Sequence, residues 1–186
     1  MMTEISLNIL DVAQNSIRAD ASLIEIEVAA DSRKDILTVV IRDDGCGMSL
    51  EQTKQVTDPF FTTRTTRKIG LGIPFFKMAA ESTGGSFSIT SEPGKGTAVK
   101  AVFVLSSIDR MPLGDMTGTI HALVTLNSDI DFVYTYIRDD KAFTLDTREF
   151  REILGDGIRF STPEVSSYIK EYLNENKEDA DNGTVI

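Results

Sequence analysis

The sequence predicts an α/β sandwich in which helices cover one face of a mixed β-sheet. Apolar residues recur at helical spacing near the N-terminus and again after residue 72. Short runs of alternating or β-branched apolar residues lie between and after these stretches, as strands do. Residues 6–105 therefore have the predicted order helix, two strands, two helices, two strands, which allows the helices to lie on one side of a single sheet.

The first helix is expected over residues 6–19. Four apolar residues recur there at helical spacing: Ile9, Val12, Ala13 and Ile17. Three polar residues form a second stripe at i, i+4 and i+7: Asp11, Asn15 and Arg18. This helix is thus expected to bury one stripe and to present the other outside the core.

Two strands and a short helix follow. Residues 23–28 alternate as a half-buried strand does, and residues 36–42 form a more apolar strand after a polar turn. Ser49 and Gln52 have the spacing of a capping box, which predicts a short helix through Val56.

A third helix and two more strands complete the first unit. The helix is expected over residues 72–83, with Pro74 in its first turn and a Gly-Gly pair at its end. Strands are expected over residues 86–91 and 97–105, around a Pro-Gly-Lys-Gly turn.

The composition changes near residue 106, where a C-terminal extension is expected to begin. Residues 109–118 are rich in Pro, Gly and Met and are predicted to form a linker or an ordered loop. Residues 119–126 and 132–138 are predicted to be two strands around a polar turn.

Two helices are expected after these strands. Asp146 or Thr147 caps a short helix that ends at Gly155, and Thr162 precedes a proline that starts the last helix. The polar tail from about residue 176 is expected to be disordered. The predicted organisation is a domain over residues 1–105, a ββαα extension over 106–175 that packs on it, and a tail over 176–186.

Composition limits the class of protein. The chain has 186 residues, of which 41% are hydrophobic and 26% charged, as is usual for a soluble globular protein. Its net charge of -10 argues against a protein whose main partner is nucleic acid or an anionic membrane. One cysteine excludes an intrachain disulfide. Because the chain shows no signal-peptide pattern and no apolar run of about 20 residues, a cytoplasmic location is expected.

The polar stripe of the first helix can bind a metal ion and phosphate. The amide oxygen of Asn15 is a hard, neutral ligand that suits magnesium. The Asp11 carboxylate, one turn away, can polarise an attacking group or hold a magnesium-bound water. Arg18 adds a positive charge within reach of phosphate. The alternative is a solvated helix face without a ligand.

Three further blocks have the residue types of a nucleotide pocket. In residues 43–47, the Asp43 carboxylate at a strand end can accept a hydrogen bond from an exocyclic amine, although the same sequence also suits a plain tight turn. Residues 58–68 combine hydroxyl and basic side chains before a helix N-terminus, which is typical of an anion site or of a mobile basic loop. Residues 94–97 do not form a Walker A loop, because glycine follows Gly-Lys and the context is strand–turn–strand.

Together these blocks resemble the GHKL superfamily, most closely the ATP-binding catalytic domain of sensor histidine kinases. Residues 7–16 resemble its N box, 43–47 its first glycine box, 58–64 its F box, 70–73 its second glycine box and 94–97 its last. The resemblance covers about the first 105 residues. It implies a Bergerat-type ATP-binding fold with ATP and Mg²⁺ as cofactors.

The resemblance also implies roles for single residues. Asn15 would coordinate magnesium, Asp43 would bind the adenine amine, and Thr97 would lie near the base. The residues implied in nucleotide binding are Asn15, Arg18, Asp43, Gly45, Gly47, Met48, Phe61, Thr63, Arg64, Lys68, Gly70, Leu71, Gly72 and Thr97. Asp11 stands where hydrolytic members have a glutamate general base and is therefore the candidate catalytic residue. The only histidine, His121, falls outside the blocks and is expected to be structural.

Three functions remain open at this point. The first is a kinase-like regulator that transfers the γ-phosphoryl group of ATP to a separate partner protein. The second is an ATP-hydrolysing conformational switch in which Asp11 activates water. The third is a module that senses nucleotide without catalysis. The expected partner is a protein, with a homodimer as a further possibility, and neither nucleic acid nor a membrane is expected.

Overall fold

A computed structural model describes residues 3–58, 72–155, 157 and 159–182. Six strands form one sheet in the order β3-β4-β2-β1-β5-β6. The elements in chain order are α1 (Ile5–Arg18), β1 (Leu23–Asp31), β2 (Ile36–Asp43), α2 (Leu50–Gln55), α3 (Gly72–Ser82), β3 (Ser86–Glu92), β4 (Gly96–Val104), α4 (Met116–Leu126), β5 (Asp131–Arg138), β6 (Lys141–Asp146), α5 (Thr147–Leu154) and α6 (Pro163–Asp181).

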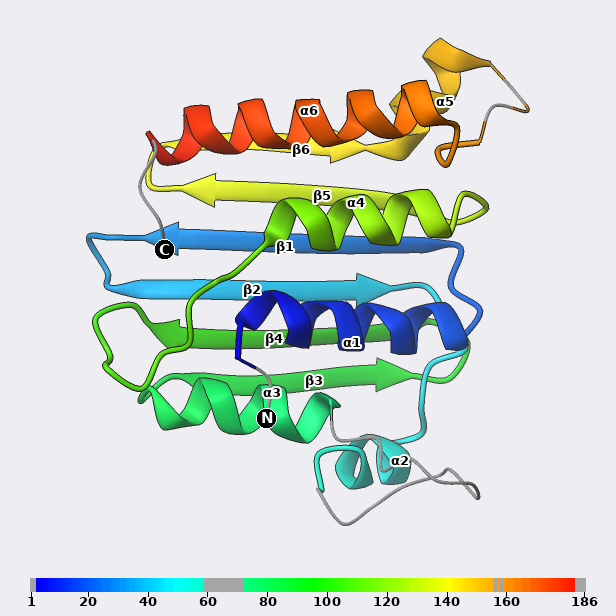
Figure 1. Ribbon diagram of the computed structural model, residues 1–186. Helices are drawn as coiled ribbons and strands as arrows, with labels where there is room; N and C mark the ends of the chain where they lie inside the picture. The colour runs from blue at the N-terminus through cyan, green and yellow to red at the C-terminus, as the bar shows by residue number, and fades with distance from the viewer. Residues whose placement is uncertain (1–2, 59–71, 156, 158, 183–186) are drawn as a thin grey trace.

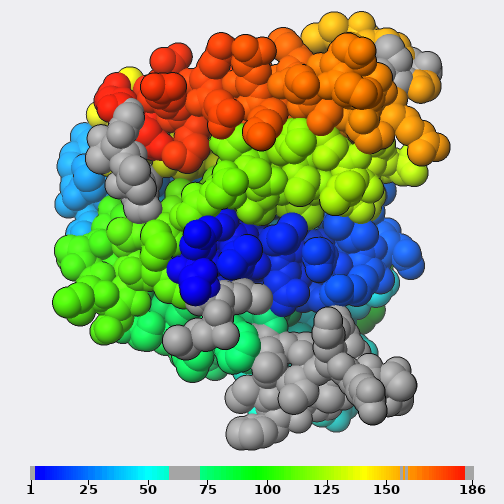
Figure 2. Space-filling model, viewed as in Figure 1, coloured from blue at the N-terminus to red at the C-terminus, as the bar shows by residue number. Residues whose placement is uncertain are grey.

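The sheet is mixed, and its long helices lie on one face. Strands β1 and β5 are parallel, and the other neighbouring strands are antiparallel. Figure 1 shows α3, α1, α4 and α6 side by side in front of the sheet, and Figure 2 shows how closely α1, α4 and α6 cover it. This arrangement confirms the predicted α/β sandwich with helices on one face.

Alternation along the strands explains the core. In β1 every second residue is buried, and Ile24, Ile26 and Val28 are at most 2% exposed. Ile5 and Ile9 of α1 pack into the same cluster of buried side chains. Because successive strand residues point to opposite faces, this pattern places one apolar row under the helices and leaves the other row on the far face.

The predicted elements of the first 105 residues are present within a few residues of their expected ends. The Ser49–Gln52 capping box forms in both directions: Gln52 N–H donates to Ser49 Oγ, and Ser49 N–H donates to Gln52 Oε1. The starts of α5 and α6 are also as predicted, with Asp146 and Thr162 at the N-cap positions.

The prediction of a strand over residues 119–126 is wrong, because this segment lies in helix α4. Its β-branched residues suit a strand, but Ile120, Leu123 and Val124 recur at helical spacing and are buried. The helix starts where Asp115 accepts a hydrogen bond from Gly118 N–H at 2.8 Å, inside the segment expected to be a linker or loop. The second strand of the extension is instead β6, so the extension has the order αββαα.

The prediction of disorder from residue 176 is also wrong up to Asp181, because α6 continues to that residue. Asp181 is 4% exposed and accepts a hydrogen bond from Tyr136 Oη at 2.6 Å. Its other oxygen accepts from Lys177 Nζ at 2.6 Å. Burial is the main cause that raises the pKa of Tyr136, and the hydrogen bond to Asp181 is the second. The Tyr136 hydroxyl therefore stays protonated and remains a donor. These contacts hold the polar end of α6 on the sheet.

The extension continues the sheet of the first 105 residues. Strand β5 pairs with β1 over eight residue pairs, and both parts contribute to the same buried cluster. The described residues on both sides of residue 105 thus share one sheet and one buried cluster, and the division into a domain and an extension stays a prediction. Among the described residues, no helix combines the length and the apolarity that a membrane span requires.

Candidate functional site

The carboxylate of Asp43 lies at the end of β2 and joins three parts of the site. Ser16 Oγ of α1 donates to Asp43 Oδ2 at 2.5 Å. The N–H groups of Gly45 and Thr97 donate to Oδ1 at 3.0 and 3.2 Å. A carboxylate accepts about four hydrogen bonds, so Asp43 retains one acceptor position after these three. That position, on Oδ2, is the one at which the adenine amine is predicted to bind, and this role remains a prediction.

The loop after Asp43 is fixed against α1 and the β3–β4 hairpin. Cys46 N–H donates to Ala19 O at 2.8 Å, and Met48 N–H donates to Ser91 Oγ at 2.8 Å. Gly47 has a φ of +65°, and a Cβ there would lie 2.0 Å from Glu92 O. A larger residue at position 47 would therefore separate the loop from the hairpin.

Gly45 is required for the same kind of reason. A Cβ at Gly45 would lie 2.7 Å from Ala19 O. Gly45 and Gly47 thus let the loop pack closely on its neighbours, which is a structural need that exists without a nucleotide. Their roles at the adenine remain predictions.

The carboxylate of Asp44, unlike that of Asp43, binds the residues at the start of β1. It accepts from Ser22 N–H at 2.7 Å, from Leu23 N–H at 2.9 Å and from Ser22 Oγ at 2.5 Å. Partial burial opposes the charge, but the hydrogen bonds from Ser22 and Leu23 outweigh it and hold the pKa of the Asp44 carboxyl below its ordinary value. Asp44 therefore anchors the start of β1.

The polar stripe of α1 forms the second half of the site. Arg18 is exposed, and its Nη1 donates to Asn15 Oδ1 at 3.0 Å. Thus the oxygen predicted to bind magnesium accepts a hydrogen bond from the cation predicted to bind phosphate. The amide oxygen has a second lone pair, but the positive charge of Arg18 would repel a metal ion bound there. Phosphate in front of the helix would attract Arg18 and relieve that repulsion, and the metal role of Asn15 remains a prediction.

Asp11 lies against the start of α3. A Cβ at Gly72 would be 1.8 Å from Asp11 Oδ2, so the carboxylate fits only beside a glycine. Asp11 is half-buried and forms no hydrogen bond or ion pair with the described part of the chain. Its catalytic role remains a prediction.

The structure brings the described site residues into one region. Helix α1 carries Asp11, Asn15 and Arg18, and contacts link it to Gly72 and to Asp43. Six predicted residues lie outside the described residues, and their roles remain predictions: Phe61, Thr63, Arg64, Lys68, Gly70 and Leu71.

Two positioning residues escaped the sequence analysis. Ser16 is 3% exposed and orients Asp43, while Ser91 Oγ donates to Gly96 O at 2.9 Å and contacts Thr97 Oγ1 at 2.9 Å. The signal for Ser16 was its place on the apolar stripe of the helix, because a hydroxyl in a core stripe needs a partner there.

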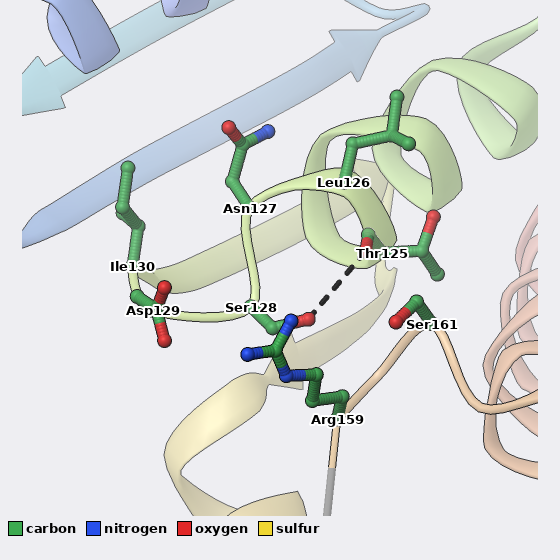
Figure 3. A pocket seen from close by; sticks show the side chains of 8 residues that line it. All are labelled: Thr125, Leu126, Asn127, Ser128, Asp129, Ile130, Arg159 and Ser161. Carbon is green, nitrogen blue, oxygen red and sulfur yellow. Dashed lines mark hydrogen bonds between the residues drawn. The ribbon is translucent and has the colours of Figure 1, made fainter.

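Among the hollows of the structure, one of about 360 Å³ lies at the ends of β2 and β4. Its lining includes Asp43 and Thr97, but Arg42, Thr90 and Ala98 belong to the row on the other face of the sheet, so this hollow is not the helix-side position predicted for adenine. A second, of about 240 Å³, lies between the α4–β5 turn and the segment of Arg159 and Ser161. Figure 3 shows its polar lining, in which Ser128 Oγ donates to Thr125 O. None of the predicted site residues lines this second hollow.

His121 is placed away from these groups. It lies in α4, correcting the strand expected there, and its Nε2 is 2.9 Å from Ser166 Oγ and 3.1 Å from Ser166 O of α6. The ring is half-buried between the two helices and joins them, as expected for a structural residue.

Sensor proteins are among the relatives that are similar to this chain. The sensor protein SrrB of Staphylococcus aureus is 34% identical over 101 residues, which cover 52% of this chain and 17% of SrrB. The sensor protein DegM of Bacillus sp. (strain B21-2) is 32% identical over 91 residues, which cover 49% of this chain and 24% of DegM. The chain thus spans at most about a quarter of these relatives.

A solved structure and a family model extend the comparison. The N-terminal domain of a DNA repair protein has a TM-score of 0.57 at 16% identity, covering 84% of this chain and 58% of that one, and so shows a shared fold. The family model described as histidine kinase-, DNA gyrase B-, and HSP90-like ATPase matches residues 2–107, more than half of the chain. The chain therefore belongs to the family of histidine kinase-, DNA gyrase B- and HSP90-like ATPases.

Proposed function

We propose that this protein binds ATP with magnesium and transfers the γ-phosphoryl group to a separate partner protein. One observation supports this proposal above the others: the Ser16–Asp43 hydrogen bond joins the phosphate-side helix to the base-side strand end. Asp43 would bind the adenine amine, while Asn15 and Arg18 of the same helix would face the phosphates. Phosphoryl transfer depends chiefly on such positioning and on charge neutralisation.

Asn15 would be the protein ligand of the magnesium ion. The described residues contain no group of three or more His, Cys, Asp or Glu side chains placed to hold a metal. An ion bound through one amide oxygen would therefore take its other ligands from phosphate and water, as magnesium commonly does. The bound ion would neutralise phosphate charge, and Arg18 would assist once it leaves Asn15 Oδ1.

The acceptor would belong to another protein. His121 is the only histidine of the chain, and it contacts Ser166 of α6 rather than the polar stripe of α1. The sensor proteins similar to this chain support a signalling role in which the ATP-binding unit acts on a partner. We propose a cytoplasmic location on the same ground.

A second candidate is ATP hydrolysis. It is favoured by Asp11, a carboxylate without a hydrogen bond to the described residues, next to the start of α3 at Gly72. Such a group could take a proton from an attacking water. In that case the protein would be a switch, with ATP and ADP states that differ in the surface they offer to a partner.

The test is the fate of γ-labelled ATP with the purified protein and magnesium, alone and with candidate partner proteins. The proposal predicts bound ATP that stays intact until a partner is added, and label that then moves to the partner. Steady phosphate release that is lost in Asp11→Asn but kept in the control Glu171→Gln would establish hydrolysis instead. Glu171 is an exposed residue of α6, so its change tests loss of a carboxylate away from the site.

Asn15→Ala separates a true site from incidental binding. We expect it to lose magnesium-dependent ATP binding, while Asn174→Ala, an exposed asparagine of α6, should bind as the natural protein does. Equal MgATP affinity of Asn15→Ala and Asn174→Ala, measured by calorimetry, would refute the magnesium role of Asn15.

A further inference from the structure

The sheet has a second face that the long helices do not cover. Helices α1, α3, α4 and α6 contact the strands from one side, as Figure 1 shows. Strand registers place alternate residues of all six strands on the other side. Solvent reaches this face: Lys100, Arg42 and Thr144 are exposed, and Val133 and Ile137 are only half-buried.

One row across this open face is composed of small apolar and hydroxyl side chains. The register aligns six residues in the order of the strands: Ser86, Val102, Thr38, Ala29, Ile137 and Ala142. Such a row is flat and carries no charge. It therefore suits packing against another sheet, whose inner side chains lie across a layer about 10 Å thick.

The next two rows carry charges that are sorted by strand. Arg42 on β2 and Lys100 on β4 are positive, whereas Glu25 and Glu27 on the adjacent β1 are negative. None of the four forms an ion pair or hydrogen bond with a described residue. Two positive and two negative groups thus lie on opposite sides of the line between β2 and β1.

The far corner of the face contributes little net charge. Asp146 at the end of β6 pairs with Arg148 at 2.6 Å, so these two charges compensate each other. Arg148 also has a favourable electrostatic interaction with Glu25. Apart from this interaction of Glu25, the charges on β4, β2 and β1 of this face have no ion-pair partner among the described residues.

We propose that this open face binds a second copy of the chain in a face-to-face dimer. The two-fold axis lies midway between the two sheets, parallel to the strands and above the line between β2 and β1. Rotation about it places β2 of one protomer over β1 of its partner. It places Arg42 of one protomer over Glu25 of its partner, and the partner's Arg42 over Glu25 of the first. Lys100 comes within one strand of the partner's Glu27.

The same operation matches the uncharged row with itself. Thr38 comes over Ala29 of the partner, and Val102 comes over Ile137. A two-fold axis across the strands would instead place β1 on β1 and β2 on β2, which sets like charges against each other. Charge complementarity therefore selects the axis along the strands.

The size of the face allows such a dimer. Six strands at about 4.8 Å spacing are about 24 Å wide, and seven residues at about 3.3 Å make a strand about 23 Å long, so the flat area is roughly 550 Å². A standard interface buries about 800 Å² of accessible surface on each partner, and side-chain relief raises the accessible area above the flat value. We expect a dimer whose outward helices leave Asp11, Asn15 and Arg18 of both protomers uncovered.

Two charge reversals test the proposal through self-association, which is measured in the absence of nucleotide. In Arg42→Glu, both pairs formed by positions 42 and 25 of the two protomers have two negative charges. In Glu25→Arg, both pairs have two positive charges. Either variant alone should weaken self-association at least about 100-fold, because like charges then meet twice in each dimer. A 1:1 mixture of the two variants restores both pairs and should form a heterodimer.

The measurement is molar mass by light scattering or sedimentation over a range of concentrations. The natural chain and the mixture should approach twice the chain mass of 20.5 kDa, while each variant alone should stay at 20.5 kDa. Glu171→Arg on the exposed side of α6 is the control and should dimerise normally. Circular dichroism of each variant shows whether it is folded.

Three results would overturn the proposal. They are a natural chain that remains monomeric at several hundred micromolar, a dimer that persists in both reversal variants, and folded variants that stay monomeric when mixed. Arg42 and Glu25 are also neighbours on paired strands of the same protomer, so each reversal places like charges side by side within one chain. Mixing the two variants does not remove that repulsion within each chain, so a dimer that forms only in the mixture must come from contacts between chains.

Discussion

The side chain of Asp43 has a structural role and a proposed binding role, and two substitutions separate them. Asp43→Ala removes the acceptor for Ser16 Oγ and for the N–H groups of Gly45 and Thr97. Asp43→Asn keeps the shape of the side chain. Its amide oxygen can still accept from the two N–H groups, and its amide nitrogen can donate to Ser16 Oγ.

The structure sets the size of each effect. A buried polar group left without a partner costs about 1–3 kcal/mol, and Ser16 is buried while the two N–H groups are partly buried. Taking about 1 kcal/mol for each of the three donors, Asp43→Ala should lose about 3 kcal/mol of unfolding free energy. For a domain of this size that loss lowers Tm by roughly 6–12 °C. Asp43→Asn should lose about 1 kcal/mol or less.

Nucleotide affinity should show a different pattern. In Asp43→Asn, the amide nitrogen replaces the acceptor position of Oδ2, so a donor faces the adenine amine. A hydrogen bond to a charged group contributes about 1.5–3 kcal/mol, which corresponds to a loss of roughly 10- to 150-fold in ATP affinity. Thus the asparagine variant should be nearly as stable as the natural protein and yet bind ATP poorly.

Urea unfolding gives the stability, and calorimetric titration with MgATP gives the affinity. Asp129→Asn, at an exposed aspartate outside the candidate site, is the matched control and should change neither quantity. If Asp43→Asn binds MgATP as tightly as the control, Asp43 does not bind the adenine amine. If Asp43→Ala is as stable as the natural protein, the three hydrogen bonds do not hold the site together.

Three further predictions test other contacts. Gly72→Ala places a methyl group against the Asp11 carboxylate, so the variant should have a lower Tm than the natural protein. A larger loss of Tm in the double variant Gly72→Ala/Asp11→Ala than in Gly72→Ala alone would contradict this clash. Tyr136→Phe removes a buried hydrogen bond to Asp181 and should cost about 1–2 kcal/mol in urea unfolding; no change would mean that this contact does not hold α6. The pKa of Asp44 is lower in the folded than in the unfolded chain, so its contribution to stability is present above about pH 4 and is lost as the pH falls through the folded value. Asp44→Asn should therefore flatten the acid side of the stability–pH curve, and an unchanged slope below pH 4 would count against this anchor.

Local patterns predicted the first half of the fold well. The apolar stripe of α1, the alternation of β1 and the Ser49 capping box each depend on residues within a few positions of one another. Such short-range signals do not depend on which distant segment packs against them. They therefore remained valid in the folded chain.

The extension was predicted less well, because its elements depend on what they pack against. Residues 119–126 have β-branched side chains, yet they form α4, where Ile120, Leu123 and Val124 face the core. Strand β6 is short and was not predicted, but pairing with β5 buries Phe143 and Leu145. Both outcomes follow from burial against distant strands and helices.

By itself, the sequence determined that helices would cover one face of a mixed sheet, and it placed the candidate ligands of the site on the first helix and at two strand ends. Only the tertiary structure decided how these parts meet. Ser16 and Asp43 are 27 residues apart, and their hydrogen bond exists because the core holds α1 against the end of β2. The pairing of β5 with β1, the contact of Asp11 with Gly72 and the sorting of charges on the open face likewise join distant segments. A local pattern can state which side chains are available, but the distances between them are set by the packing of the whole chain.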